Sequence, residues 1–105
     1  MAEPVGLYIT FWATPGKIDA LVEALKPMLA EVLGEPGTLA YGLHRVSGAL
    51  EGVSVYEIYA DAEAQALHVR SDAIEALKAK LPELLGAPPE RPTLTPIAGA
   101  KGLPF

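Results

Sequence analysis

Hydrophobic and polar residues alternate along three segments of the chain, and this pattern predicts three β-strands. In residues 5–13 the two faces carry Val5, Leu7, Ile9, Phe11 and Ala13 on one side and Tyr8, Thr10 and Trp12 on the other. Residues 39–47 place Leu39, Tyr41, Leu43 and Arg45 on one face and Ala40, Gly42, His44 and Val46 on the other. Residues 53–60 form the third segment, and the short loop between Gly48 and Gly52 predicts that it pairs with the second as an antiparallel hairpin.

Helical spacing of apolar residues follows the first and third strands. Residues 16–33 carry an apolar stripe, in which Pro27 lacks a backbone N–H and is expected to kink or weaken the helix. Asp61 is a good N-cap for a short helix that reaches about Val69, and Ser71 starts another helix. Residues 92–98 are the last strand candidate, and their prolines favour an edge position.

The resulting order is β-α-β-β-α-β, with the second helical unit divided in two. This order predicts an α+β, ferredoxin-like fold: a four-stranded antiparallel sheet with its helices on one face. The other face would expose apolar and aromatic side chains, at a cost of roughly 25 cal/mol per Å². We therefore expect a second copy of the chain to cover that face and to form a homodimer.

Length and charge restrict the possibilities further. The 105 residues predict a single domain over 1–105, with its core in 5–98 and a C-terminal tail in 99–105. The net charge of −5, without a cluster of Lys and Arg, argues against nucleic-acid and anionic-membrane partners. The absence of cysteine excludes disulfides and thiolate chemistry. No signal peptide or membrane-spanning stretch is recognisable, so a cytoplasmic location is the expectation.

Four short motifs resemble, in order and spacing, those of the antibiotic-biosynthesis-monooxygenase family. They are Pro15-Gly16-Lys17 after the first strand, Glu35-Pro36-Gly37 followed by Tyr41-Gly-Leu-His44-Arg45, Tyr56-Glu57-Ile58-Tyr59, and Ala66-Leu67-His68-Val69-Arg70-Ser71. The chain differs from the family pattern at two places. Asp72-Ala73 stands where many relatives have a second histidine, and Tyr59 replaces a tryptophan.

The resemblance implies a dimeric α+β barrel with a pocket between the sheet and the helices of each subunit. It also implies a monooxygenase that uses O₂ without a cofactor, on a small aromatic, phenolic or quinol substrate. Heme-degrading relatives depend on an asparagine, a tryptophan and a histidine. This chain contains no asparagine, and its tryptophan, Trp12, lies on the first strand, so we do not expect heme degradation.

His68 is the leading candidate for a catalytic residue. A neutral imidazole can accept a phenolic proton near pH 7 and can donate to a developing oxyanion. Glu57 interrupts an apolar strand and must be paired, hydrogen-bonded or near water. Arg45 is an available ion-pair partner for Glu57, and the alternative is that Glu57 orients His68. A purely structural role for His68, as an anchor of the short helix, also remains open.

The candidate substrate-binding residues are His44, Tyr56, Tyr59 and Trp12. The small neighbours of His44 could leave room for a ligand, although a position at a sheet or dimer interface is the alternative. The aromatic residues could equally fill the core. No histidine–carboxylate spacing on one element supports a metal site.

Two other functions stay open at this point. One is a non-catalytic ligand-binding or stress-protective module, and the other is a cofactor-free isomerase or other proton-transfer enzyme, because a fold alone does not determine an activity.

Overall fold

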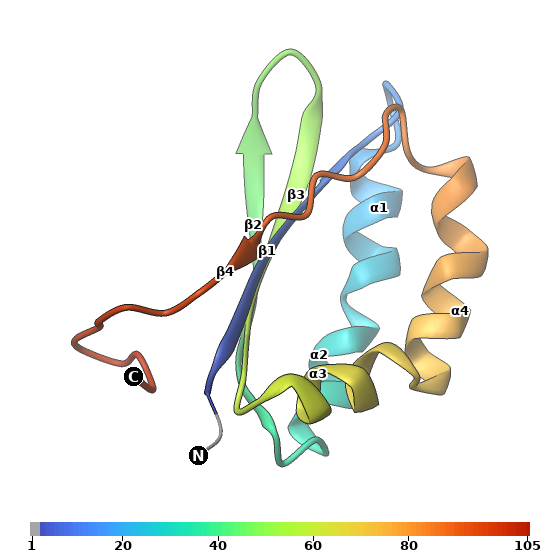
Figure 1. Cartoon of the computed structure of the whole chain (residues 1–105). Helices are drawn as coiled ribbons and strands as arrows, with labels where there is room; N and C mark the ends of the chain where they lie inside the picture. The colour runs from blue at the N-terminus through green and yellow to red at the C-terminus, as the bar shows by residue number, and fades with distance from the viewer. Residues whose placement is uncertain (1–2) are drawn as a thin grey trace.

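One antiparallel sheet forms the centre of the molecule, as the computed structural model, which describes residues 3–105, shows (Figure 1). Across the sheet the strands follow the order β2-β3-β1-β4, which is the ferredoxin-like arrangement expected from the sequence. The strands are β1 (Val5–Trp12), β2 (Thr38–Ser47), β3 (Glu51–Tyr59) and β4 (Thr93–Leu94).

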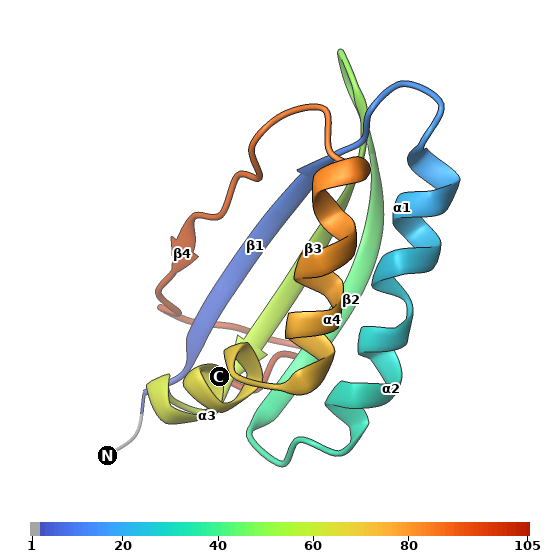
Figure 2. The same ribbon diagram turned by 90° about the vertical axis from the view of Figure 1, so that its right-hand side faces the viewer.

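All helices lie on one face of the sheet (Figures 1 and 2). Helices α1 and α2 run beside α4 over the strands, and α3 crosses near the end of β1 where the chain begins (Figure 2). The helices are α1 (Ile18–Leu25), α2 (Pro27–Leu33), α3 (Ala62–Val69) and α4 (Asp72–Lys80), which continues into one 3₁₀ turn, η1 (Leu81–Glu83). The predicted α+β fold class, with helices on one side only, is confirmed.

Pro27 divides the first helical unit, as its missing N–H predicts. Helix α1 ends at Leu25, and Pro27 occupies the first turn of α2, where no N–H is needed. Lys26 lies between the two helices and keeps helical dihedral angles of −55° and −39°. The result is a tight junction rather than a loop, so both helices still present one apolar stripe to the sheet.

The core lies between the helices and the helix-facing side of the sheet. Leu21 is completely buried, and Leu25 and Met28 are nearly so. They pack against alternate residues of the two central strands, namely Ile9, Phe11, Val53 and Val55. Ile9 and Phe11 belong to the apolar face that the alternation predicted for the first strand.

The second face of the sheet has no helix over it in the described part of the chain (Figure 1). Strand pairing places Tyr8 beside Tyr56 and Thr10 beside Ser54 on this face. The Thr10 and Ser54 hydroxyl oxygens are 2.8 Å apart and form a buried hydrogen bond. Tyr8 remains 39% exposed. We refer to this surface as the open face.

The last strand is shorter than the sequence predicted. Residues 92–98 were expected to form it, but only Thr93 and Leu94 pair, with Leu7 and Gly6 of β1. Pro92 and Pro96 flank this pair and cannot donate to a ladder. The chain before β4 nevertheless follows β1, because Thr10 and Glu90 exchange two backbone hydrogen bonds of 2.7 and 3.0 Å. This segment closes one side of the space between sheet and helices, and the residues after β4 extend away from the sheet (Figure 1).

Candidate active site

A pocket of about 400 Å³ lies between the helix-facing side of the sheet and helices α3 and α4. Its sheet wall consists mainly of apolar residues of β1, and its helix wall includes Ile74 and Leu77 of α4. The polar groups inside are few, and the central ones are Tyr41, Glu57 and His68. A largely apolar pocket with a few convergent polar groups is the usual form of a small-molecule site.

His68 is held at this pocket by the way α3 begins and packs. The side chain of Asp61 accepts a hydrogen bond of 2.8 Å from the backbone N–H of Ala64, which caps the helix. Gly37 lies against Ala64 so closely that a Cβ atom at Gly37 would overlap with it. The last turn of α3 then places His68 inward, where its side chain is only 3% exposed.

A carboxylate fixes the orientation of the imidazole. The Nδ1 atom of His68 lies 2.8 Å from Oε1 of Glu35, which comes from the connection between α2 and β2. Glu35 also accepts a hydrogen bond of 2.8 Å from the Thr38 hydroxyl. Because an ionised carboxylate can only accept, Nδ1 carries the proton in this pair. The lone pair of a neutral His68 is therefore on Nε2, which lies 4.0 Å from Oε1 of Glu57.

Glu57 is the second carboxyl group of the site and is 4% exposed. Burial raises its pKa above the ordinary value, whereas the hydrogen bond from the Tyr59 hydroxyl and the nearby His68 and Arg91 oppose this shift. The Arg45–Glu57 ion pair considered in the sequence analysis is not present. Arg45 instead lies 3.8 Å from both Asp19 and Glu51.

The hairpin register explains that correction. The strand pairing sets Tyr41, and not Arg45, opposite Glu57, while Arg45 lies opposite Val53. The hairpin prediction put Arg45 on the strand next to Glu57, but it could not say that four residues of strand separate Arg45 from the position opposite Glu57. Glu57 consequently lies beside Tyr41 and Tyr59 rather than beside Arg45.

Two tyrosine rings flank His68. The centroids of Tyr41 and Tyr59 lie 5.7 and 5.4 Å from the imidazole centroid, in tilted arrangements. Burial, together with the neighbouring Glu57, raises the pKa of both phenols well above the ordinary value. Both hydroxyls therefore stay protonated at neutral pH, and they can serve as hydrogen-bond donors but not as bases.

The structure brings together three of the residues singled out in the sequence, His68, Glu57 and Tyr59. His68 and Glu57 line the pocket, and Tyr59 contacts both of them. The other three, His44, Tyr56 and Trp12, belong to the opposite side of the sheet and do not line this pocket. The reason is the twofold period of a strand, which turns Tyr56 away from the side that Glu57 occupies.

Sequence reasoning did not assign Glu35, Tyr41 or Arg91 to the site. Tyr41 could have been found, because the alternation already placed it on the face of Arg45. Glu35 was noticed only as part of the Glu35-Pro36-Gly37 motif, and its contact with His68 joins residues 33 positions apart. Arg91 lies in an irregular segment beside β1, and the sequence of that segment has no periodic pattern that would predict its position.

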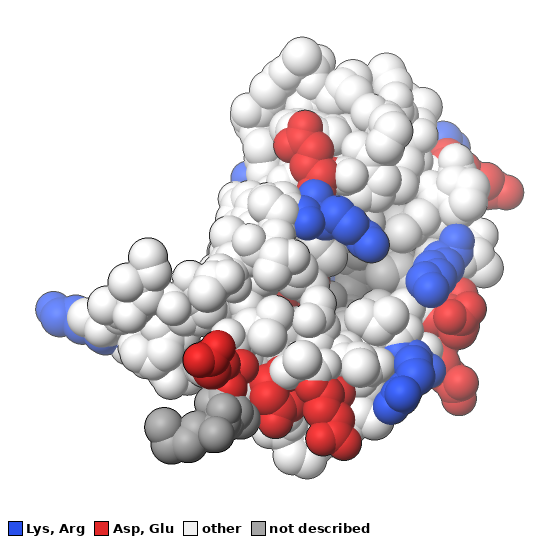
Figure 3. Space-filling view, in the orientation of Figure 1, with Lys and Arg blue, Asp and Glu red and all other residues white. Residues whose placement is uncertain are grey.

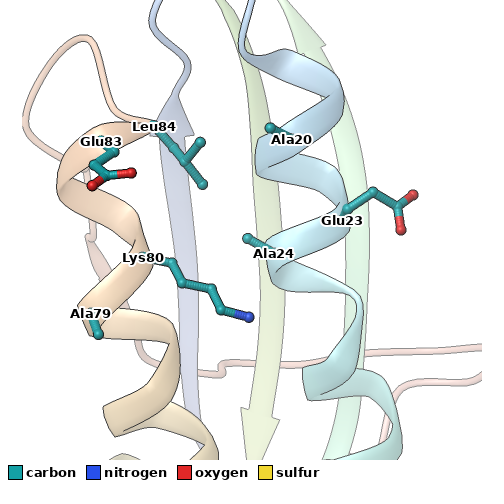
Figure 4. A pocket seen from close by; sticks show the side chains of 7 residues that line it. All are labelled: Ala20, Glu23, Ala24, Ala79, Lys80, Glu83 and Leu84. Carbon is teal, nitrogen blue, oxygen red and sulfur yellow. The ribbon is translucent and has the colours of Figure 1, made fainter.

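A second hollow, of about 470 Å³, lies between α1 and α4 (Figure 4). Alanines line both of its walls, and the Lys80 side chain extends across it from α4 towards α1 (Figure 4). Its titratable groups, Glu23, Lys80 and Glu83, are all exposed. Without a buried polar group this hollow offers no catalytic chemistry, so we place the candidate site at His68.

Within residues 3–105, His, Asp and Glu side chains form no group of three that could hold a metal ion. In the same part of the chain, none of the helices is both long enough and apolar enough to cross a membrane.

Comparison with known proteins identifies a family and a fold. The sequence profile of the family described as antibiotic biosynthesis monooxygenase matches residues 4–80. No functionally curated protein matches the chain. Among solved structures, Rv0793 from Mycobacterium tuberculosis is 26% identical with a TM-score of 0.85, and the similarity covers 93% of this chain and 99% of that one.

Two further structures show the same likeness. PA3566 from Pseudomonas aeruginosa is 26% identical with a TM-score of 0.84, and the match covers 93% of this chain and 98% of the other. SO0527 from Shewanella oneidensis is 24% identical with a TM-score of 0.82, with 90% and 91% covered, and at this identity it supports the fold alone.

Proposed function

The chain belongs to the antibiotic biosynthesis monooxygenase family, and on that premise we propose that it oxygenates a small phenolic or quinol substrate with O₂ and without a cofactor. One observation carries the proposal: a buried imidazole, oriented through Nδ1 by Glu35, lines an apolar pocket together with Glu57. An orienting carboxylate leaves Nε2 free to act as a base, in the manner of a general base held by a third group.

The first step requires only a proton acceptor. His68 takes the phenolic proton of a quinol through Nε2, and the resulting anion transfers one electron to O₂. The semiquinone and superoxide combine and form a C–O bond at a ring carbon. Loss of the remaining hydrogen on that carbon as a proton, with cleavage of the O–O bond, releases water and leaves one oxygen in the product. A quinol and O₂ thus become a hydroxyquinone and water, and no external reductant is needed.

The neighbours of His68 stabilise the charges that this sequence creates. The Tyr41 hydroxyl is protonated and lines the pocket, where it can donate to the substrate oxyanion. A protonated Glu57 can donate in the same way, and burial favours that form. The apolar walls exclude water, which strengthens each of these interactions and protects the radical pair.

Oxygen consumption tests the proposal directly. Wild-type protein should consume O₂ above the background of autoxidation with at least one member of a panel of hydroquinones and anthrones, and ¹⁸O from ¹⁸O₂ should enter the product. His68→Gln should lower kcat by about 10²–10⁴-fold, the usual contribution of a general base. His44→Gln, which changes the histidine on the open face, is the matched control and should leave kcat unchanged.

Two results would remove the oxygenase proposal. One is the absence of O₂ uptake above background over the whole panel. The other is equal activity of the wild type and His68→Gln. Exchange of a substrate C–H proton without O₂ uptake would instead identify an isomerase-type proton transfer at the same base.

We also infer that a second copy of the chain covers the open face, because family members are commonly dimeric. Exposed aromatic surface on that face, including Tyr8 at 39%, supports this inference. Light scattering should give twice the 11.0 kDa of one chain. Tyr8→Glu should shift the protein towards the monomer, whereas Leu33→Glu, at an 89% exposed helix position, should not. A wild-type monomer at micromolar concentration contradicts the inference.

A further inference from the structure

The charged residues of the His68 pocket are arranged by depth. His68 and Glu57 lie inside and are 3% and 4% exposed. Lys78 of α4 and Arg91, which precedes β4, also line the pocket, but both are exposed. Among the described residues 3–105, Glu57 is the only acidic one that lines the pocket. The mouth of the pocket is therefore basic, and its interior is apolar with proton-transferring groups.

This local charge contrasts with the rest of the chain, whose net charge is −5. Figure 3 shows basic side chains beside a hollow on the face that it presents, with an acidic side chain directly above one of them and further acidic side chains along the lower and right-hand edges. Lys78 has one weak partner, the exposed Glu75 at 3.4 Å on its own helix. Within residues 3–105 no carboxylate oxygen lies within 4.0 Å of the Arg91 guanidinium, although its charge acts on the buried Glu57 deeper in the pocket.

We propose that the substrate carries an anionic group, of which a carboxylate is the best fit, and that Arg91 binds this group at the mouth of the pocket with help from Lys78. The proposal rests on the proposed function in one respect: the other end of the ligand is the phenolic group that reaches His68. A guanidinium presents a planar fork of donors that matches a carboxylate in two parallel hydrogen bonds, whereas the Lys78 ammonium acts as a point charge.

Such a contact at the mouth would also set the direction of the ligand. The ring system would lie between the apolar residues of β1 and α4, Ile9 and Leu77 among them. With its anion held at Arg91, the phenolic end points inward to His68 and the opposite orientation is disfavoured. Arg91 is thus a specificity-determining residue for acidic phenols and quinols.

Binding in the absence of O₂ tests this inference without turnover. The probes are 1,4-dihydroxy-2-naphthoic acid and its methyl ester, which share one ring system and differ in charge. In anaerobic calorimetric titrations the wild type should bind the acid about tenfold more tightly than the ester, as expected for one charge-assisted contact. Arg91→Gln should abolish this preference because it weakens binding of the acid but not of the ester. Arg91→Lys should restore part of the preference.

Lys78→Gln should lower the affinity for the acid two- to threefold, since exposed ion pairs contribute little. Lys80→Gln is the matched control, because Lys80 lies on the same helix but lines the other hollow. Higher salt should weaken binding of the acid more than binding of the ester. Circular dichroism spectra that match the wild type establish that the variants are folded.

Three results overturn the proposal: equal affinity for acid and ester, equal weakening of both by Arg91→Gln, and no binding of either compound at millimolar concentration. The outcome is separable from that of the oxygenase proposal. A charge preference lost in Arg91→Gln, with no O₂ uptake, supports the anion site and removes the oxygenase. Uptake of O₂ with neutral quinols and no preference for the acid supports the oxygenase and removes the anion site.

Discussion

Replacing Tyr59 by phenylalanine removes one hydroxyl group from the interior and little else. The ring of Tyr59 is completely buried, and phenylalanine keeps its shape. The lost hydroxyl is the donor to Oε1 of Glu57, itself 4% exposed. A hydrogen bond to a charged acceptor contributes about 1.5–3 kcal/mol, and one to a neutral acceptor about 0.5–1.5 kcal/mol. The loss of stability should therefore depend on the protonation state of Glu57.

The sign of this pH dependence follows from the linkage between protonation and folding. Burial raises the pKa of Glu57 in the folded protein, so below its ordinary value of 4.5 the carboxyl is neutral, and at high pH it is ionised. Tyr59→Phe should cost about 0.5–1.5 kcal/mol at pH 4 and about 1.5–3 kcal/mol at pH 8. With roughly 2.1 cal/mol/K of unfolding entropy per residue over 105 residues, these costs correspond to Tm decreases of roughly 2–7 °C and roughly 7–14 °C.

Differential scanning calorimetry at fixed protein concentration measures both values. Tyr56→Phe is the matched control on the open face, and its small effect should not change with pH. In a Glu57→Gln background the cost of Tyr59→Phe should stay near its low-pH value throughout. An equal cost at pH 4 and pH 8, or the same cost with and without Glu57, would refute the reasoning.

Three other outcomes can be measured by urea unfolding. The raised pKa of Glu57 gives stability that is present below pH 4.5 and is lost as pH rises through the folded-state pKa. Glu57→Gln should therefore make the free energy of unfolding less dependent on pH, and towards pH 9 the variant should become more stable relative to the wild type. A difference in unfolding free energy that does not change with pH would contradict this expectation. Leu21 is fully buried, so Leu21→Ala should lower the free energy of unfolding by about 2–5 kcal/mol. A loss below about 1 kcal/mol would show that neighbouring side chains relax into the cavity. Gly37→Ala should lower the free energy of unfolding by about 1–3 kcal/mol because the new Cβ meets Ala64. Gly34→Ala, whose new Cβ would have its nearest neighbour at 3.6 Å, should lower it less, and equal losses would argue against the close contact at Gly37.

The periodic parts of the structure were predictable because each repeats a local rule. Alternation separated Leu7, Ile9 and Phe11 from Tyr8, Thr10 and Trp12 within the first strand before any pairing was known. Pro27 marked the division between α1 and α2, since a missing N–H acts within one helical turn. These features depend on neighbours in the sequence, and the sequence contains that information directly.

The contacts that define the site depend on distances between segments. Periodicity gave the face of Arg45 but not its register. Arg45 was therefore considered as a partner of Glu57, whereas the strand pairing places it opposite Val53. The contact between His68 and Glu35 needs the loop after α2 to meet the end of α3, and no repeating pattern describes that loop. The small neighbours of His44 suggested room for a ligand or a place at an interface, and strand alternation alone does not say which face will receive the helices.

Strand β3 has a consequence for engineering the molecule. Its odd-numbered residues, such as Glu57 and Tyr59, lie on the side of the sheet that the helices cover, and its even-numbered residues, such as Tyr56 and Ile58, lie on the other side. Mutant libraries can therefore randomise one set of positions while the other stays untouched, although the two sets are interleaved along a single ribbon. Insertion or deletion of one residue in the middle of β3 would exchange the two sets beyond that point, so length changes there should be far more damaging than substitutions.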